Sequence, residues 1–178
     1  MATTKTKPQP TETTPENEKV VEAPEEKRIV PKEIDPNQYV VVRNGFQGTL
    51  VYRSPRTGEM FEWDSFGAEQ EMELRELRNA KNSEKSFFIN NWFMFDDEWV
   101  VDYLGVRQYY KNSVKIEDFD KLFSKPPEEL KKVLKSMPDG QESSVAYRAH
   151  ELIANGEIDS RKTIAAIEEG LGVELIER

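Results

Sequence analysis

The side chains that could do chemistry in this sequence are few in kind: one histidine, no cysteine and 34 carboxylates. His150 is the only side chain whose ordinary pKa lies near neutrality, as a general base requires. It has no cysteine to activate, and no serine stands in a nucleophile-elbow motif. Zinc sites built from cysteine and histidine are excluded by the same counts. We therefore interpret His150 as a half-exposed helix residue rather than as a catalytic base.

The carboxylates include three groups that could serve acid–base or metal chemistry. Two residues alternate onto one side of an expected strand, three share a flank of an expected helix, and three stand in a row: Glu62 and Asp64; Glu69, Glu73 and Glu76; Asp96, Asp97 and Glu98. Magnesium sites and glycosidases use such pairs. However, the sequence contains neither a Gly-rich phosphate loop nor a calcium-binding loop, and the row at Asp96 is more simply a helix cap. We expect no enzyme activity, no metal and no cofactor.

The composition limits the partners of the chain. Charged residues make up 33% of it, and the net charge is −9. No stretch approaches the roughly 20 apolar residues that a membrane span requires, and no apolar run follows the first lysines as it would in a secretory signal. Affinity for phosphate backbones depends on Lys and Arg, so the negative charge disfavours nucleic acid. We expect a cytoplasmic protein that does not enter membranes.

The first 36 residues differ from the rest of the chain. They contain six of the ten prolines, six threonines and no aromatic residue. Such a segment has too little apolar surface to offset the entropy of ordering it, which predicts a flexible arm. The arm is either a solvating tail or a tether that orders on a partner through Ile29 and Val30, and the composition does not separate these alternatives.

A small sheet is expected after the arm. From Tyr39 the residues alternate with period two, which predicts a strand that ends at Asn44-Gly45. Further strands at 48–54 and 60–63 flank a turn at 55–58. We predict that the three strands form an antiparallel meander. The next segment, AEQEMELRELRN at 68–79, consists of strong helix formers and predicts an acidic helix packed against the meander.

The densest aromatic stretch follows, SFFINNWFMFDDEWV at residues 86–100. Its rings permit a helical stripe, but WFMF is equally compatible with a short strand, and we expect a break near Asp96 followed by a helix that stops before Gly105. Fully burying such a ring contributes about 2–3 kcal/mol, so we assign most of the rings to the core. Trp99, Tyr109 and Tyr110 are assigned to an outward-facing docking surface, because aromatic residues concentrate at interfaces.

The remainder of the chain is predicted to be helical. Apolar stripes mark short helices separated by Pro126-Pro127, by a turn at 138–140 and by Asn155-Gly156. Asp159 or Ser160 caps the last helix, whose inward stripe is Ile164, Ile167 and Leu171. The predicted fold class is α+β. Its parts are a disordered arm at 1–36, a β-meander with its helix and aromatic junction at 37–112, and a C-terminal helical bundle at 113–178.

Nucleic-acid binding is the alternative to protein binding. Arg53 and Arg56, together with Arg43, lie close to aromatic residues of the expected sheet, where phosphate contacts and base stacking combine. Against this, Tyr52 and Arg53 are adjacent in a strand and face opposite sides, and the acidic helix repels phosphate. The last two helices also permit a helix-turn-helix interpretation. A regulator that binds nucleic acid or a transcription complex is therefore the second hypothesis.

Three stretches carry a resemblance to a known class of proteins: VVVRNGFQGTLVYRSPRTGEMFEWDSFG, MELRELRNAKN and FFINNWFMFDDEWVVDYLGVRQYYKN. With them, residues 37–178 resemble small uncharacterised structural proteins encoded by tailed bacteriophages. The resemblance implies an accessory virion component bound to capsid, connector or tail, with other virion subunits as partners. It also implies a location in the host cytoplasm during assembly and in the virion afterwards, and it supplies no functional residue.

The leading prediction is a non-enzymatic protein-interaction module, with its oligomeric state left open. The residues expected to bind a partner are Ile29, Val30, Arg53, Arg56, Trp99, Tyr109 and Tyr110.

Overall fold

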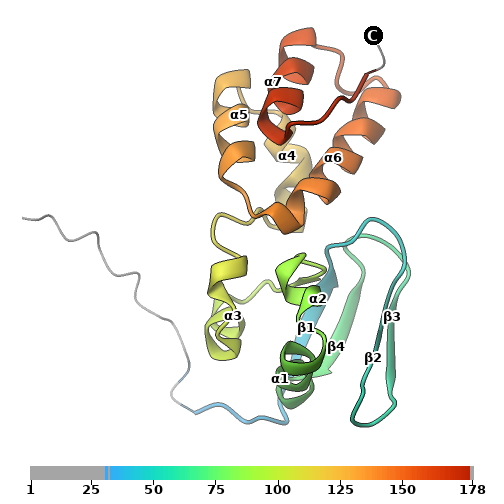
Figure 1. Ribbon diagram of the computed structural model, residues 1–178, viewed down its shortest axis with the longest axis vertical. Coiled ribbons are helices and arrows are strands. Elements are labelled where there is room, and N and C mark those ends of the chain that lie inside the picture. Colours follow the sequence, from blue (N-terminus) through green and yellow to red (C-terminus); the bar gives the residue numbers. More distant parts are fainter. Residues whose placement is uncertain (1–30, 32, 177–178) are drawn as a thin grey trace, which may run out of the picture.

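The computed structural model describes residue 31 and residues 33–176, and it confirms the α+β class (Figure 1). The described chain forms two lobes, which we call the sheet lobe (residues 33–110) and the bundle lobe (residues 114–176). Each lobe has its own cluster of buried apolar side chains. Most of the predicted arm, including Ile29 and Val30, lies outside the described residues.

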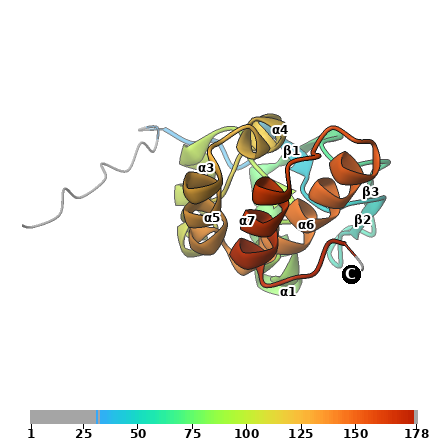
Figure 2. The same cartoon turned by 90° about the horizontal axis from the view of Figure 1, so that it is seen from above.

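The order of elements follows the two lobes. The sheet lobe contains β1 (Tyr39–Asn44), β2 (Leu50–Arg53), β3 (Met60–Trp63), β4 (Glu69–Glu73), α1 (Leu74–Ser83), α2 (Ser86–Ile89), β5 (Phe93–Met94), α3 (Glu98–Leu104) and the 3-10 helix η1 (Arg107–Tyr109). The bundle lobe contains the 3-10 helix η2 (Ile116–Asp118), α4 (Phe119–Phe123), α5 (Pro127–Ser136), α6 (Asp139–Ala154) and α7 (Arg161–Leu171). In both views α7 lies between α5 and α6 (Figures 1 and 2).

The larger sheet is built around β1, in the antiparallel order β4-β1-β5. The predicted alternation along β1 is present: Val40 and Val42 are buried, whereas Tyr39 and Val41 are exposed. β2 and β3 form a separate two-stranded hairpin. The three predicted strands therefore exist, but the predicted meander is wrong, because β1 pairs with β4 and β5 rather than with β2.

The chain leaves the larger sheet and re-enters it at a single point. The Asn44 backbone N–H donates to the Ala68 carbonyl (2.9 Å), and the Gly67 N–H donates to the Asn44 carbonyl (2.8 Å). The buried side-chain amide of Asn44 donates to the carbonyls of Gly48 and Ser65. The intervening residues consequently form an excursion that carries the β2–β3 hairpin, and β1 finds its partner only after it.

β4 occupies the first part of the predicted helix at 68–79, so the helix prediction is wrong for residues 69–73. On propensity alone, EQEME favours a helix. A strand forms there because β1 offers it a ladder of paired positions, in which fully buried Met72 lies opposite Val40. Packing against cross-strand neighbours decides strand formation more than intrinsic preference does. α1 then begins at Leu74.

The aromatic stretch is divided into several elements. α2 ends before Asn91, which adopts a left-handed φ of 50° that interrupts any helix. β5 then pairs with the end of β1. α3 begins after Asp97 and ends at Leu104, directly before Gly105, whose left-handed φ of 67° is typical of the residue that follows a helix. The predicted break near Asp96 and the predicted stop at Gly105 are both confirmed.

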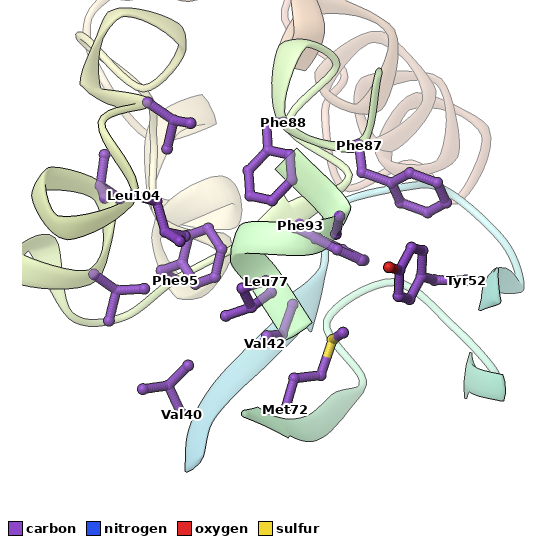
Figure 3. Close-up of a cluster of buried hydrophobic side chains, with 14 of the residues drawn as sticks. Val40, Val42, Tyr52, Met72, Leu77, Phe87, Phe88, Phe93, Phe95 and Leu104 are labelled. Carbon is purple, nitrogen blue, oxygen red and sulfur yellow. The ribbon is translucent and has the colours of Figure 1, made fainter. Parts of the chain in front are cut away.

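Phe93 lies at the centre of the sheet-lobe core (Figure 3). Its ring is fully buried, and its centroid lies 4.8–5.7 Å from the rings of Tyr52, Trp63, Phe87 and Phe88. The assignment of most rings in the aromatic stretch to the core is confirmed. The buried rings are Phe87, Phe88, Phe93 and Phe95, and the partly buried ones are Trp92 and Trp99.

The helices of the bundle lobe follow the predicted apolar stripes. In α7 the buried residues include Ile164, Ile167 and Leu171. Ser160 is the N-cap of this helix, and its hydroxyl oxygen accepts the Thr163 N–H. The prediction of a cap at Asp159 or Ser160 is therefore confirmed for Ser160.

The start of α6 corrects another prediction and joins the two lobes. Residues 138–140 are not a separate turn, because α6 already begins at Asp139. Gly140 lies so close to the end of α2 that a Cβ atom on it would be 2.5 Å from the Ile89 carbonyl oxygen. One turn later, the buried Ser144 hydroxyl donates to the Gly45 carbonyl (2.6 Å). The lobes are thus held together by close backbone contact and a buried hydrogen bond.

Candidate protein-interaction sites

Tyr52 and Glu76 form the most deeply buried pair of titratable side chains that hydrogen-bond to each other in the described part of the chain. The Tyr52 hydroxyl donates to Glu76 Oε1 (2.8 Å), and Arg56 Nη2 lies 3.6 Å from Oε2. Burial and the Glu76 carboxylate raise the pKa of Tyr52. Burial alone would raise the pKa of Glu76, but hydrogen bonds from Ser54 and Tyr52 outweigh it, so the pKa is lowered. Neither side chain lines the two pockets described below, and we assign the pair to stability.

Glu76→Gln is expected to lower the free energy of unfolding by about 1–2 kcal/mol at neutral pH, because an amide accepts less strongly from Tyr52 and Arg56 than a buried carboxylate does. The pKa of Glu76 lies below its ordinary value of 4.5 in the folded protein. The difference between the two proteins is therefore fully present above pH 4.5 and shrinks as the pH falls through the folded-state pKa.

Urea denaturation of both proteins from neutral to acid pH measures this difference. Glu71→Gln, at an exposed position on β4, is the matched control and should change stability little. A difference between Glu76→Gln and the native chain that did not vary with pH would contradict the assignment.

The outward face of the β2–β3 hairpin is formed by four residues, Val51, Arg53, Met60 and Glu62, which we call the hairpin face. Their cross-strand partners are Arg53 with Met60 and Val51 with Glu62. Met60 is 63% exposed and Val51 is 46% exposed. The opposite face carries fully buried Tyr52 and Trp63, so the exposed residues are held on a fixed support.

The three arginines of the nucleic-acid hypothesis lie in different settings, two on this hairpin and one on β1. Arg53 is exposed and belongs to the hairpin face. Arg56 lies in the turn between the strands, where it pairs with buried Glu76. Arg43, on β1, pairs with Glu69 (2.7 Å) and with Asp96 (2.8 Å). Because two of the three arginines are engaged by carboxylates, this geometry does not favour the nucleic-acid hypothesis.

The predicted aromatic anchors are not outward-facing. Trp99, Tyr109 and Tyr110 are partly buried and pack against the sheet-lobe core. The Tyr110 hydroxyl donates to the Phe93 carbonyl (2.7 Å), and the Asn91 side chain donates to the Tyr109 carbonyl (2.9 Å). These hydrogen bonds hold the Tyr110 ring and the backbone of Tyr109 against the core. Their role in partner binding stays a prediction.

A pocket of about 790 Å³ lies beside these rings. Its apolar lining includes Phe95 and Val101, and Tyr110 also contributes to it. Sequence reasoning missed its charged lining, which is formed by Arg107, Lys111 and Lys115 together with the carboxylate Glu98. The signal that could have revealed this lining is the segment RQYYKNSVK, in which the three cations recur every four positions. Two tyrosines lie between the first cation and the second.

A second, smaller pocket of about 420 Å³ lies where the lobes meet. It is lined by residues from both lobes, among them Phe66 and Tyr147. Arg148, also in its lining, is held by Asp120 and Glu151. Hydrogen bonds from Arg148 lower the pKa of Asp120.

The remaining candidates for chemistry lie apart from one another. His150 is exposed on α6 rather than half-exposed, and it lines neither pocket. Within residues 31 and 33–176, no group of three or more His, Asp or Glu side chains is arranged to hold a metal ion. In the same part of the chain, no helix combines the length and the apolar character that a membrane crossing needs.

Comparison of the sequence with known protein families and with curated proteins, and of the structure with solved structures, gives no match.

Proposed function

We propose that this protein is a non-enzymatic interaction module that binds other proteins through the hairpin face. The observation that supports the proposal is the exposure of Met60 and Val51 beside Arg53 on a rigid hairpin. The residues on the solvent-facing side of an antiparallel sheet are ordinarily polar. Methionine and arginine, in contrast, are enriched where protein surfaces meet. A partner that covered these side chains would remove two large apolar groups from water.

The partner that we propose is another subunit of a tailed-bacteriophage virion, bound in capsid, connector or tail. This part of the proposal is supported by the resemblance of residues 37–178 to small structural proteins of such phages. Assembly would then take place in the host cytoplasm.

The variant Val51→Asp/Met60→Asp is expected to weaken incorporation into particles at least tenfold, since each substitution places a carboxylate in the centre of the contact. Quantitative mass spectrometry of purified particles from the encoding phage measures the copy number. The matched control is Val173→Asp/Ile176→Asp, which changes two exposed aliphatic residues of the bundle lobe in the same way. Absence of the native chain from particles, or equal incorporation of both variants, would overturn the proposal.

A further inference from the structure

The pocket beside α3 differs in charge from the protein as a whole. The chain carries a net charge of −9. The pocket lining nevertheless contains three cations, Arg107, Lys111 and Lys115, against one carboxylate, Glu98. Asp102 offsets the charge of Arg107, so the cationic character of the lining comes from Lys111 and Lys115, and a single anionic group gains most by binding beside them.

Two of the three cations are held in place by neighbouring groups. Arg107 forms a two-bond pair with Asp102, whose side chain is 2% exposed, and the Nη2–Oδ2 distance is 2.8 Å. Lys115 Nζ lies 3.5 Å from the Asp96 carbonyl oxygen. A buried carboxylate that orients an arginine reduces the entropy that the arginine loses on binding.

The wall that carries these cations is also fixed to the bundle lobe. Asn112 Nδ2 donates to the Ser136 carbonyl (3.1 Å). The Gln141 side chain accepts the Val114 N–H (2.8 Å) and donates to the Val114 carbonyl (2.7 Å). The segment that connects the lobes is thus anchored to α5 at Asn112 and to α6 at Val114, next to the lysines that line the pocket.

The floor of the pocket is apolar. Met94, Phe95 and Val101 line it and are each less than 10% exposed as whole residues. A volume of about 790 Å³ lies in the range that accommodates small ligands or a few side chains. A ligand that matches this lining would combine an apolar group with an anionic one.

We infer that this pocket binds an acidic peptide segment of a partner protein. An Asp or Glu side chain of the peptide pairs with Lys111 and Lys115, and a neighbouring aromatic or aliphatic side chain lies on Phe95 and Val101. Glu98 accepts a peptide N–H. Nucleic acid fits less well, because Lys111 and Lys115 match the charge of one or two carboxylates, whereas the exposed row Asp96, Asp97 and Glu98 beside them repels a continuous array of phosphates.

A displayed library of random short peptides, selected on the full-length chain, supplies the probe. The enriched peptides are expected to combine an acidic residue with an adjacent aromatic or aliphatic one. The most enriched peptide is then synthesised with a fluorescent label, and its affinity is measured by anisotropy. Lys111→Glu/Lys115→Glu should weaken binding at least tenfold, and added salt should weaken binding to the native chain.

Two controls make the result specific. Lys132→Glu/Lys135→Glu changes two exposed lysines of α5 by the same charge and should leave the affinity unchanged. A peptide with lysine in place of its acidic residue should bind Lys111→Glu/Lys115→Glu more tightly than it binds the native chain. Circular dichroism verifies that all variants are folded.

The inference is overturned if the enriched peptides carry no acidic residue, or if they bind Lys111→Glu/Lys115→Glu as tightly as the native chain. It is also overturned if an oligonucleotide binds the native pocket more tightly than the selected peptide does. Val51→Asp/Met60→Asp should retain peptide binding, because neither residue lines the pocket. The test of the pocket is therefore independent of the test of the hairpin face. Loss of one function without the other identifies which proposal fails.

Discussion

Phe93→Ala is expected to lower the free energy of unfolding by about 3–5 kcal/mol, the usual cost of removing a buried aromatic ring. Phe93 has no surface accessible to water, and the centroids of four aromatic rings lie within 5.7 Å of the centroid of its ring. Each of these rings would border the cavity left by the substitution. Because domains are stable by only about 5–15 kcal/mol, the variant should be close to the limit of folding.

Urea denaturation followed by tryptophan fluorescence measures this effect. All three tryptophans of the chain, Trp63, Trp92 and Trp99, lie in the sheet lobe. The control is Phe46→Ala, since Phe46 is 38% exposed and contacts only the edge of this ring cluster, at Trp92. It should cost less than about 1 kcal/mol. A similar small loss for Phe93→Ala would contradict the central place of this ring in the core.

Gly140→Ala is expected to uncouple the two lobes. Replacing glycine by alanine inside a helix normally stabilises it by up to about 1 kcal/mol. Here the added Cβ would lie 2.5 Å from the Ile89 carbonyl oxygen and 2.6 Å from the Asn90 carbonyl carbon, both backbone atoms that cannot rotate away. Forcing α6 away from α2 should cost about 3 kcal/mol and should weaken the nearby Ser144–Gly45 hydrogen bond.

Two probes of one denaturation experiment separate the lobes. Tryptophan fluorescence follows the sheet lobe, and far-ultraviolet circular dichroism is dominated by the helices of the bundle lobe. We expect the two transitions to coincide in the native chain and to separate in Gly140→Ala. Ser143→Ala, at an exposed position of the same helix, should stabilise slightly and keep the transitions together. Coincident transitions in Gly140→Ala would show that the contact does not couple the lobes.

The elements best predicted from the sequence are those that depend on neighbouring residues. The stripe of Ile164, Ile167 and Leu171, the cap at Ser160 and the stop at Gly105 all lie within or directly beside the helices that they define. Helix periodicity and capping are local properties, so a single sequence contains the information needed to find them.

The errors arise where a partner distant in the sequence decides the structure. EQEME forms a strand because β1, thirty positions earlier, supplies its ladder, as in the pair Val42 and Gln70. The prediction of a meander is wrong for the same reason, since the Asn44 backbone forms hydrogen bonds with Gly67 and Ala68, which follow the hairpin. Neither long-range pairing leaves a local signal that could outweigh helix propensity or the simplest order of strands.

The candidate sites also combine features that depend on neighbouring residues with features that depend on distant ones. Alternation along β2 places Arg53 and Val51 on the outer face, which the sequence alone predicts. The spacing of Arg107, Lys111 and Lys115 is visible in the sequence, but the pocket that they line also needs residues of β5 and α3, and no local pattern brings these segments together. Trp99, Tyr109 and Tyr110 were expected outside, and their inward placement follows from core contacts that no local pattern specifies.

The excursion between Asn44 and Ala68 also bears on where the chain can accept an insertion. Its two ends are fastened to each other by backbone hydrogen bonds, and the turn at its tip contacts α1 through Ser54 and Arg56 at Glu76. Lengthening a surface loop carries a small entropic penalty, about 0.6 kcal/mol for each doubling. Gly58 at the tip faces open space. An insertion beside Gly58 is therefore expected to cost little stability as long as Arg56 keeps its pairing with Glu76, because Tyr52 and Trp63 hold the base of the hairpin in the core.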